Sequence, residues 1–541
     1  MLIHELIEGN ARRAPNGLAW QFGDRRHTWA EIEERTARIA ANLSFRGFRP
    51  GDRFALFSEN SDYLAELYFA LARCGVIAVP INPRSVLREI EFILTDVGAR
   101  GLFASAKLAP RLAPEPGAPL RVNVELLVGA GEGHRCPVDV SELYAPAPPS
   151  RPVEDPDLIR AIKYTSGTTG SPKGCMSSQR QTLFSLQNYL IQMPFQYDER
   201  CLLSLPMTAG VGIYLLMAYV YKGLPTILHE RFDADLFLDE IERSRVTRFY
   251  VVPTIISALV NAQTLKPRDT SSLRYAGYGG SPAAFALIKR AMESFSCGFY
   301  QTFGSSETGG FVTCLKPEDH RLLVAENTGV SDSAGVVIMP CGQEIPGSHV
   351  RLVNDAGGDV PVGEIGEIWV RSDSTMSGYW NRPEQTAESF CQGWLKSGDL
   401  GVRDKYGFVS VVDRKKDMII SGGFNIYSSE VESIIERHPG VAKVGVVGKP
   451  DPHWGETVVA FVVRHAGAQC SAEELAQLCE TGLASFKRPE MFLFVDTLPE
   501  TSTGKIRKAE LRQQAIALAK ADAGAKSPSA GERGDNVALS R

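Results

Sequence analysis

The sequence lacks the cysteine spacing that a zinc site or a disulfide framework needs. Its ten cysteines are scattered, and no two of them form a Cys-x-x-Cys pair. Such a distribution is typical of reduced thiols in the cytosol. We therefore expect a cytoplasmic protein that contains neither structural zinc nor disulfide bonds.

Long hydrophobic runs and an excess of basic charge are also absent. The longest hydrophobic stretch, residues 213–221, is far shorter than the roughly 20 residues of a membrane-spanning helix. The short apolar N-terminal stretch is interrupted by Glu5 and Glu8, unlike a signal peptide. A net charge of -5 lacks the excess of positive charge that is typical of nucleic-acid-binding proteins. These absences predict no transmembrane segment and no nucleic-acid partner, whereas peripheral contact with a membrane stays open.

What the chain does contain is ordinary globular composition, with 44% hydrophobic and 22% charged residues. Its 541 residues exceed one hydrophobic core, so several structural units are expected. Short apolar segments at 54–57, 76–79 and 101–104 are typical of buried strands, and residues 62–73 between them have helical periodicity. Residues 202–302 repeat this alternation, which predicts an α/β fold with helix-covered parallel sheets.

The second half of the chain has a different pattern. Residues 350–412 contain short alternating strands with glycine turns, which predict a small β unit. Beyond the charged segment 413–417, alternating patterns predict a separate α+β domain. Its expected elements are a helix at 428–438, strands at 443–447 and 457–463, a helix at 472–483 and a strand at 491–495.

A loop at residues 164–174 combines glycines, hydroxyls and one lysine, in the order Tyr-Thr-Ser-Gly-Thr-Thr-Gly-Ser-Pro-Lys-Gly. Glycines let backbone N–H groups approach phosphate oxygens, while hydroxyls and Lys173 add donors and charge. The loop is not of the GxxxxGK[ST] kind, because Pro172 precedes the lysine and Gly174 follows it. It predicts a polyphosphate-binding loop, with a polar surface loop as the alternative.

Three further segments supply what a nucleotide site needs. Residues 301–308 offer an aromatic ring for a base, hydroxyls for phosphate and a carboxylate for Mg²⁺. Residues 279–282 allow close backbone approach to a planar ring, and 397–399 place a carboxylate in a tight turn, where it can accept hydrogen bonds from ribose. Taken singly, each segment is equally an N-cap, a turn or a solvated aspartate.

In order and spacing these segments, together with 366–367, 378–380, 393–394, 413–417 and 499–505, resemble the adenylate-forming superfamily. That superfamily includes acyl-CoA synthetases, peptide-synthetase adenylation domains and beetle luciferase, and the resemblance, closest to the acyl-CoA synthetase branch, covers about residues 5–515. It implies a large, multi-subdomain N-terminal AMP-binding domain, residues 1–412, a hinge at 413–417, with Lys416 as the hinge residue, and a smaller mobile C-terminal domain at 418–520. Residues 521–541 are expected to form a disordered tail because they lack apolar periodicity.

The resemblance also implies roles in the nucleotide site. Glu307 would hold Mg²⁺, the loop from Thr165 to Lys173 would order the β- and γ-phosphates, Phe303 would pack on adenine, and Asp399 with Arg414 would bind the ribose. The remaining residues expected to contact ATP or CoA are Ser166, Gly167, Thr168, Thr169, Gly279, Gly280, Ser281, Gln301, Thr302, Gly304 and Ser306, with Gly422 and Gly423 along the pantetheine path.

Lys505 is the residue expected to drive the first step. An acid carboxylate and the α-phosphate of ATP are both anions, so a bridging cation lowers their repulsion and stabilises charge in the transition state. With Glu307 and Thr165 it forms the predicted catalytic set. The alternative, a solvated surface lysine, is the usual role of this residue type.

The expected acid pocket is formed by Ala209, Gly210, Tyr214, Gly279, Gly304 and Gly309. Many relatives place a histidine or an aromatic residue where this chain has Ala209, so the gate is small and apolar. Residues 210–214 contain no aspartate that would bind an amino-acid ammonium. An apolar acid, fatty or aromatic, is therefore predicted.

The predicted function is an ATP-dependent acyl-CoA synthetase that uses Mg²⁺ and CoA. An adenylating enzyme that loads a separate carrier protein and a non-catalytic relative are the alternatives, and luciferase-like oxidation is more remote. Retention of Glu307, Asp399, Arg414 and Lys505 argues against a non-catalytic role. The sequence leaves a homodimer open.

Overall fold

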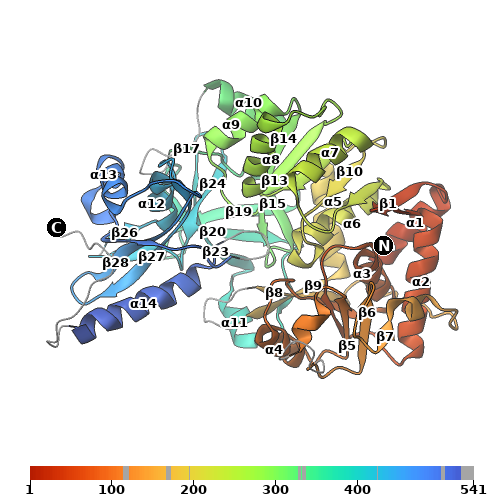
Figure 1. Ribbon diagram of the computed structural model, residues 1–541. Coiled ribbons are helices and arrows are strands. Elements are labelled where there is room, and N and C mark those ends of the chain that lie inside the picture. Colours follow the sequence, from red (N-terminus) through yellow and green to blue (C-terminus); the bar gives the residue numbers. More distant parts are fainter. Residues whose placement is uncertain are drawn as a thin grey trace.

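The computed structural model describes residues 1–113, 121–165, 172–193, 195–326, 330–331, 337–422, 424–500 and 506–525. Two large mixed sheets with their helices and one small antiparallel sheet make up the N-terminal part (Figure 1). The smaller C-terminal part, blue in Figure 1, lies beside the small sheet. The predicted α/β fold with a smaller C-terminal α+β domain is confirmed, while the exact domain limits stay predictions.

The first large sheet carries one wall of the site. Its strands are, in spatial order, β18 (Gln343–Glu344), β15 (Gly310–Leu315), β14 (Gly298–Ser305), β13 (Tyr275–Gly279), β12 (Arg248–Val251), β10 (Cys201–Leu203), β11 (Thr226–Leu228), β1 (Leu18–Phe22) and β2 (Arg25–Thr28). The pairs from β14 across to β1 are parallel, as expected for strands joined through helices. The helices of this region are α5 (Gln179–Gln192), α6 (Val211–Lys222), α7 (Ala234–Ser244), α8 (Pro253–Leu265), α9 (Phe285–Ser294) and α10 (Pro317–Glu326), with a 3₁₀ turn at Met207–Ala209.

The second large sheet carries the phosphate-loop segment. Its order is β21 (Gly378–Tyr379), β9 (Lys173–Ser178), β8 (Ile159–Thr165), β4 (Ile77–Pro80), β3 (Arg53–Phe57), β5 (Gly101–Ser105), β6 (Leu126–Ala130) and β7 (Val138–Asp139). Its helices are α2 (Trp29–Phe45), α3 (Asp62–Cys74) and α4 (Leu87–Val97), with 3₁₀ turns at Ala109–Leu112 and Val140–Tyr144, while α1 (Ile3–Arg13) packs on α2, α3 and α6. The largest apolar cluster joins the two sheets through buried side chains such as Trp20, Phe54 and Leu216.

The small sheet leads to the C-terminal part. It consists of β19 (Ser348–Val353), β20 (Ile365–Ser372), β23 (Trp394–Arg403), β22 (Phe390–Cys391) and β24 (Val409–Arg414), with α11 (Pro383–Glu388) nearby and the pair β16 (Val330–Ser331) and β17 (Val337–Ile338) apart from it. The C-terminal sheet consists of β26 (Phe424–Ile426), β25 (Ile419–Ser421), β28 (Gly455–Arg464), β27 (Val441–Asp451) and β29 (Met491–Phe494). Its helices are α12 (Ser428–Ile435), α13 (Ala472–Gly482) and α14 (Lys508–Ala525), with a 3₁₀ turn at Ser485–Lys487.

Most predicted elements are confirmed within a few residues, including the strands of the C-terminal domain. One expectation was wrong: Asp399 lies within β23 rather than in a tight turn. Helix α14, which was not predicted, runs from Lys508 to Ala525. The disordered tail expected at 521–541 stays a prediction.

No helix in the described part of the chain is long and apolar enough to cross a membrane.

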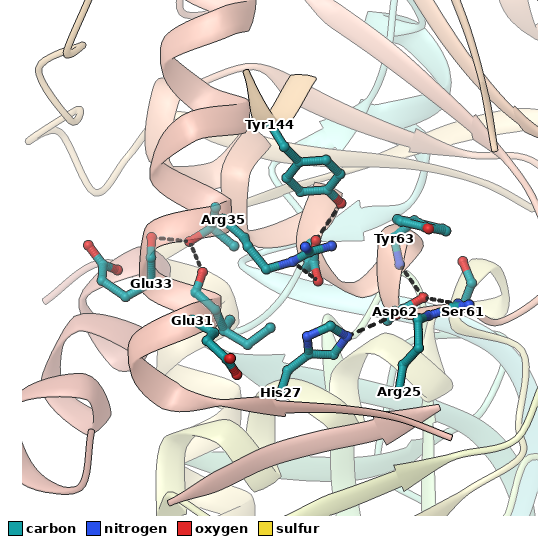
Figure 2. A network of polar contacts seen from close by, with 12 residues as sticks. Arg25, His27, Glu31, Glu33, Arg35, Ser61, Asp62, Tyr63 and Tyr144 are labelled. Atoms are coloured by element: carbon teal, nitrogen blue, oxygen red, sulfur yellow. Dashed lines mark hydrogen bonds and ion pairs between the residues drawn. The ribbon is translucent and has the colours of Figure 1, made fainter. Parts of the chain in front are cut away.

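A buried network of ion pairs fixes the N-terminal elements to one another (Figure 2). Asp62 at the start of α3 accepts two hydrogen bonds of 2.7 Å from Arg25 and one of 3.0 Å from His27, both on β2. Glu66, one turn further, accepts from Arg35 on α2 at 2.8 Å and from Tyr144 at 2.5 Å. Burial alone would raise the pKa of Asp62, but these hydrogen bonds outweigh it and lower the pKa to about 2.

Candidate nucleotide and acid site

The two large sheets meet where the phosphate-loop segment begins. Thr165 ends β8, and Glu307 lies in the turn between β14 and β15. The Thr165 hydroxyl donates a hydrogen bond of 3.2 Å to Glu307 Oε1. Tyr379 on β21 donates its hydroxyl to the same oxygen at 3.3 Å. The structure therefore brings together two members of the predicted catalytic set, which lie 142 residues apart in the sequence.

Lys173, the first residue of β9, lies directly opposite Thr165, because the two residues are register partners in the β8–β9 pair. Its ammonium lies 5.1 Å from the centre of the Tyr379 ring. The loop residues Ser166, Gly167, Thr168 and Thr169 lie outside the described part of the chain. The ends of the loop thus stand beside Glu307, and their contacts with phosphate stay predictions.

The predicted adenine region is closely packed. A Cβ at Gly279 would overlap the Tyr250 hydroxyl and the carbonyl of Thr302, and a Cβ at Gly304 would overlap the carbonyl of Gly310. Gly280 follows with a φ of 87°, a conformation that favours glycine, and precedes Ser281. These glycines let the backbones of β13, β14 and β15 approach one another. The absence of side chains at these positions would also let a planar ring such as adenine approach the backbone.

The aromatic and hydroxyl residues of 301–306 do not all face the same way. Phe303 packs against the core of the small sheet, and the carbonyl of Ser306 lies 3.1 Å from Cys175 Sγ. The side chains of Gln301 and Thr302 are buried, and Thr302 shares a 2.7 Å hydrogen bond with Tyr250. Any contact of these two residues with a nucleotide would therefore come from their main chain.

Asp399 and Arg414 form the predicted ribose pair. They face each other across β23 and β24, with Arg414 Nε 2.9 Å from Asp399 Oδ1. The nearby Asp399 carboxylate raises the pKa of Arg414, and Glu307 adds to this effect in spite of the cost of burial. The ribose pair therefore lies in the field of the predicted magnesium ligand.

The chain leaves the small sheet through the predicted hinge. Burial lowers the pKa of Lys416, and the neighbouring Arg414 lowers it further. Asp413 and Val412 bind the start of α12, with the Ser428 hydroxyl 2.8 Å from the Asp413 carboxylate and the Ser429 hydroxyl 2.5 Å from the Val412 carbonyl. These contacts mark where the two parts join, and rotation about Lys416 stays a prediction.

Residues on both sides of Lys505 contact the N-terminal part. Glu500 lies 4.0 Å from Arg84, and Arg507 lies 3.4 Å from Glu89 on α4. The same helix carries Asp96, which accepts a 2.5 Å hydrogen bond from Tyr164, the first residue of the phosphate loop. Lys505 itself lies outside the described residues. Arg507 is thus held against the helix that supports the loop, while Glu500 contacts Arg84, which precedes that helix.

The predicted pantetheine-lining glycines are only partly described. Gly422 has a φ of 58°, and a Cβ there would come within 2.9 Å of Trp454. Gly423 lies outside the described residues.

The predicted acid-pocket residues surround an aromatic cluster. Tyr214 on α6 donates its hydroxyl to the Ser185 carbonyl at 2.9 Å and lies 3.0 Å from the Ser185 hydroxyl. Its ring centre is 5.0 Å from that of Phe311, which also contacts Tyr250 at 5.6 Å and Tyr189 at 5.2 Å. A Cβ at Gly309 would overlap the Ser374 carbonyl, so Gly309 is required for packing. Ala209 and Gly210 are partly exposed at the start of α6.

Sequence reasoning missed Lys163. This lysine lies on β8 two residues before Thr165, and its Cδ would be 3.6 Å from a Cβ placed at Gly210. Burial lowers the pKa of Lys163, against the opposing effects of Cys175 and Glu307. The available signal was a lysine directly after the apolar pair Ala161–Ile162 in a strand of a covered sheet.

The family description "AMP-binding enzyme" matches residues 7–380, and "AMP-binding enzyme C-terminal domain" matches residues 430–505. The chain belongs to the AMP-binding enzyme family. Within this adenylate-forming superfamily it belongs to the acyl-CoA synthetase branch.

Individual relatives match over nearly the whole length. A feruloyl-CoA synthase of Amycolatopsis sp is 37% identical over 93% of this chain and 97% of its own. The long-chain-fatty-acid–CoA ligase FadD13 of Mycobacterium tuberculosis is 34% identical over 91% of this chain and 93% of its own. The structure of o-succinylbenzoate CoA synthetase from Bacillus subtilis, in complex with an acyl-adenylate intermediate, superimposes with a TM-score of 0.81 at 30% identity, covering 94% of this chain and 97% of that one.

Proposed function

We propose that the protein joins an apolar carboxylic acid to CoA in two steps at the site around Thr165 and Glu307. ATP and the acid first form an acyl-adenylate with release of pyrophosphate, and the CoA thiol then displaces AMP. The observation that carries this proposal is the contact of Thr165 with Glu307, beside the Asp399–Arg414 pair. This arrangement brings the phosphate-loop segment, a carboxylate that fits Mg²⁺ and a pair suited to binding ribose close together.

Glu307 fits a divalent cation. Oε1 accepts the hydroxyls of Thr165 and Tyr379, while Oε2 has no hydrogen-bond partner within the described ranges. Mg²⁺ prefers few carboxylates and keeps the remaining positions for water and phosphate oxygens. When bound, Mg²⁺ would neutralise part of the triphosphate charge.

The chain's own residues then account for the chemistry. The Thr165–Lys173 segment would hold the leaving pyrophosphate, and Asp399 with Arg414 would fix the ribose, so that the α-phosphate faces the acid. Lys505 would bridge the acid carboxylate and the α-phosphate. The contacts of Glu500 with Arg84 and of Arg507 with Glu89 support this role, because they join described residues on both sides of Lys505 to the N-terminal part.

The test is a pyrophosphate-release screen over fatty and aryl acids, each with and without CoA, followed by mass identification of the product. A CoA-dependent acyl-CoA product is expected. Adenylation of an acid without turnover on free CoA would favour the carrier-protein alternative, and one relative, of Streptomyces coeruleorubidus, is named as a fatty acid–[acyl-carrier-protein] ligase. Lack of pyrophosphate release with every acid would favour a non-catalytic role.

The cytoplasm is the compartment that we propose for this reaction. All ten cysteines are free thiols, and most of them are buried, which suits a reducing environment. A homodimer stays a prediction that sedimentation velocity tests.

A further inference from the structure

Lys163 places a positive charge on the face of β8 that carries the site. Ile162 and Tyr164 belong to the apolar cluster on the α4 side of the sheet, where Tyr164 also binds Asp96. Because successive side chains in a strand alternate between faces, Lys163 and Thr165 point to the opposite side. Thr165 meets Glu307 there.

The side chain extends toward the mouth of the predicted acid pocket. Its Cδ would be 3.6 Å from a Cβ at Gly210, the residue after Ala209. Residue 209 is alanine and contributes only a methyl group at this mouth. The polar group at this mouth is therefore provided by β8 instead of by residue 209.

The Lys163 ammonium lacks an acceptor among the residues that the structure describes. The charged or titratable groups that influence it are Cys175, Arg160 and Glu307, and none of them forms a hydrogen bond or ion pair with it. Of these, Arg160 donates to Thr182 at 2.6 Å, and Glu307 already accepts two hydroxyls. Lys163 is only partly exposed, so an ammonium with no described acceptor is suited to an anionic ligand that would complete this site.

We propose that Lys163 binds the carboxylate of the acid substrate at the pocket mouth beside Gly210, an inference that rests on the proposed function. Lys163 lies two positions before Thr165, roughly 6.6 Å along β8, and its side chain extends toward Gly210. A free acid would be held there with its carboxylate between Gly210 and the α-phosphate position. Lys163 thereby favours anionic acids over neutral analogues such as their amides.

The matched variants are Lys163→Met, which keeps length without charge, and Lys163→Arg, which keeps charge. Lys289→Met is the control, because Lys289 is exposed on α9. With ferulate, 2-succinylbenzoate and octanoate as probes, Lys163→Met should raise the KM of the productive acid about tenfold to hundredfold, the range for losing a charged hydrogen bond. The KM for ATP should change less than about twofold. Lys163→Arg should restore most of the acid affinity, which a purely structural role would not predict.

A second measurement does not need turnover. Lysines of the full-length protein are acetylated with a water-soluble succinimidyl acetate, and the rate at Lys163 is read by peptide mass spectrometry with and without each probe acid. At least one acid should slow labelling of Lys163 without slowing Lys289, whereas the corresponding amide should not.

The two hypotheses fail in different ways. Wild-type protein that releases no pyrophosphate with any acid would overturn the proposed function, while protection of Lys163 by an acid in that same protein would still support the inference. Unchanged labelling with every acid would overturn the inference. So would protection by ATP alone, or a KM effect on ATP in place of the acid.

Discussion

Thr165 and Glu307 are joined by a hydrogen bond of 3.2 Å, although Thr165 ends a strand of one large sheet and Glu307 lies in a turn between two strands of the other. This bond ties the start of the phosphate loop to the carboxylate that fits Mg²⁺. A change at either residue is therefore expected to affect metal use and phosphate binding together.

Glu307→Gln should lower the rate of pyrophosphate release by about 10²-fold or more, because it removes the charge that would hold the metal. Gln keeps an oxygen that can accept from Thr165, so the fold should persist. Pyrophosphate release measured across a Mg²⁺ titration checks this, and the half-saturating Mg²⁺ concentration should rise. Glu318→Gln, at an exposed position of α10, is the control. An unchanged Mg²⁺ dependence in Glu307→Gln would refute the metal role.

The Asp62 network predicts a stability that depends on pH. The pKa of Asp62 is about 2 in the folded protein, below the value of roughly 3.9 for an unfolded aspartate. Because the folded pKa is depressed, the ionised carboxylate stabilises the fold above about pH 4, by about 2 kcal/mol, and this contribution is lost as the pH falls to about 2.

Asp62→Asn should therefore lower the thermal midpoint at pH 7, and the gap from wild type should narrow as the pH falls from about 4 toward 2. Asp24→Asn, at an exposed position between β1 and β2, is the control, and its thermal midpoint should match that of the wild type at each pH. Melting curves recorded by circular dichroism between pH 7 and pH 3 provide the measurement. A gap that stays constant over this range would show that the network does not depend on the charge of Asp62.

The sequence predicted which residues form the site more readily than it predicted the burial and orientation of their side chains. The segments at Thr165, Glu307, Asp399 and Arg414 were predicted because their joint order and spacing resemble the adenylate-forming superfamily, although each segment alone has an ordinary structural explanation. Their burial depends on tertiary contacts, so neither the strand placement of Asp399 nor the inward side chains of Gln301 and Thr302 could be read from local patterns.

Lys163 and α14 were missed for other reasons. The position of Lys163 near the predicted acid pocket depends on the packing of β8 against Gly210, which lies 47 residues away in the sequence. Helix α14 has weak apolar periodicity and is favoured by its alanines, a signal that resembles disordered composition.

Gly310→Ala is expected to disturb the aromatic cluster around Tyr214 and Phe311 in the predicted acid pocket. A Cβ at this position would overlap the Ser185 hydroxyl and lie 3.0 Å from the Tyr214 ring. Overpacking of this kind costs about 1–3 kcal/mol. The thermal midpoint should fall, and the KM for the acid should rise because the Ser185–Tyr214 hydrogen bonds shift.

The double variant Ser185→Ala with Gly310→Ala gives the comparison. Removing the hydroxyl leaves the Ser185 Cβ 3.2 Å from the new methyl group, a much milder contact. The thermal midpoint of the double variant should therefore lie above that of Gly310→Ala alone. Purely additive losses would mean that Ser185 does not limit the space at Gly310.

Lys505→Ala separates the two half-reactions. Loss of the bridging cation should lower pyrophosphate release by at least about 10²-fold, the usual cost of removing one electrostatic stabiliser. Transfer of the acyl group from a synthetic acyl-adenylate to CoA should change far less, because that step needs no contact between two anions. Lys405→Ala, at an exposed turn before β24, is the control. Near-normal pyrophosphate release in Lys505→Ala would remove the residue from the catalytic set, and the contacts of Glu500 and Arg507 with the N-terminal part would then serve only to dock the C-terminal domain.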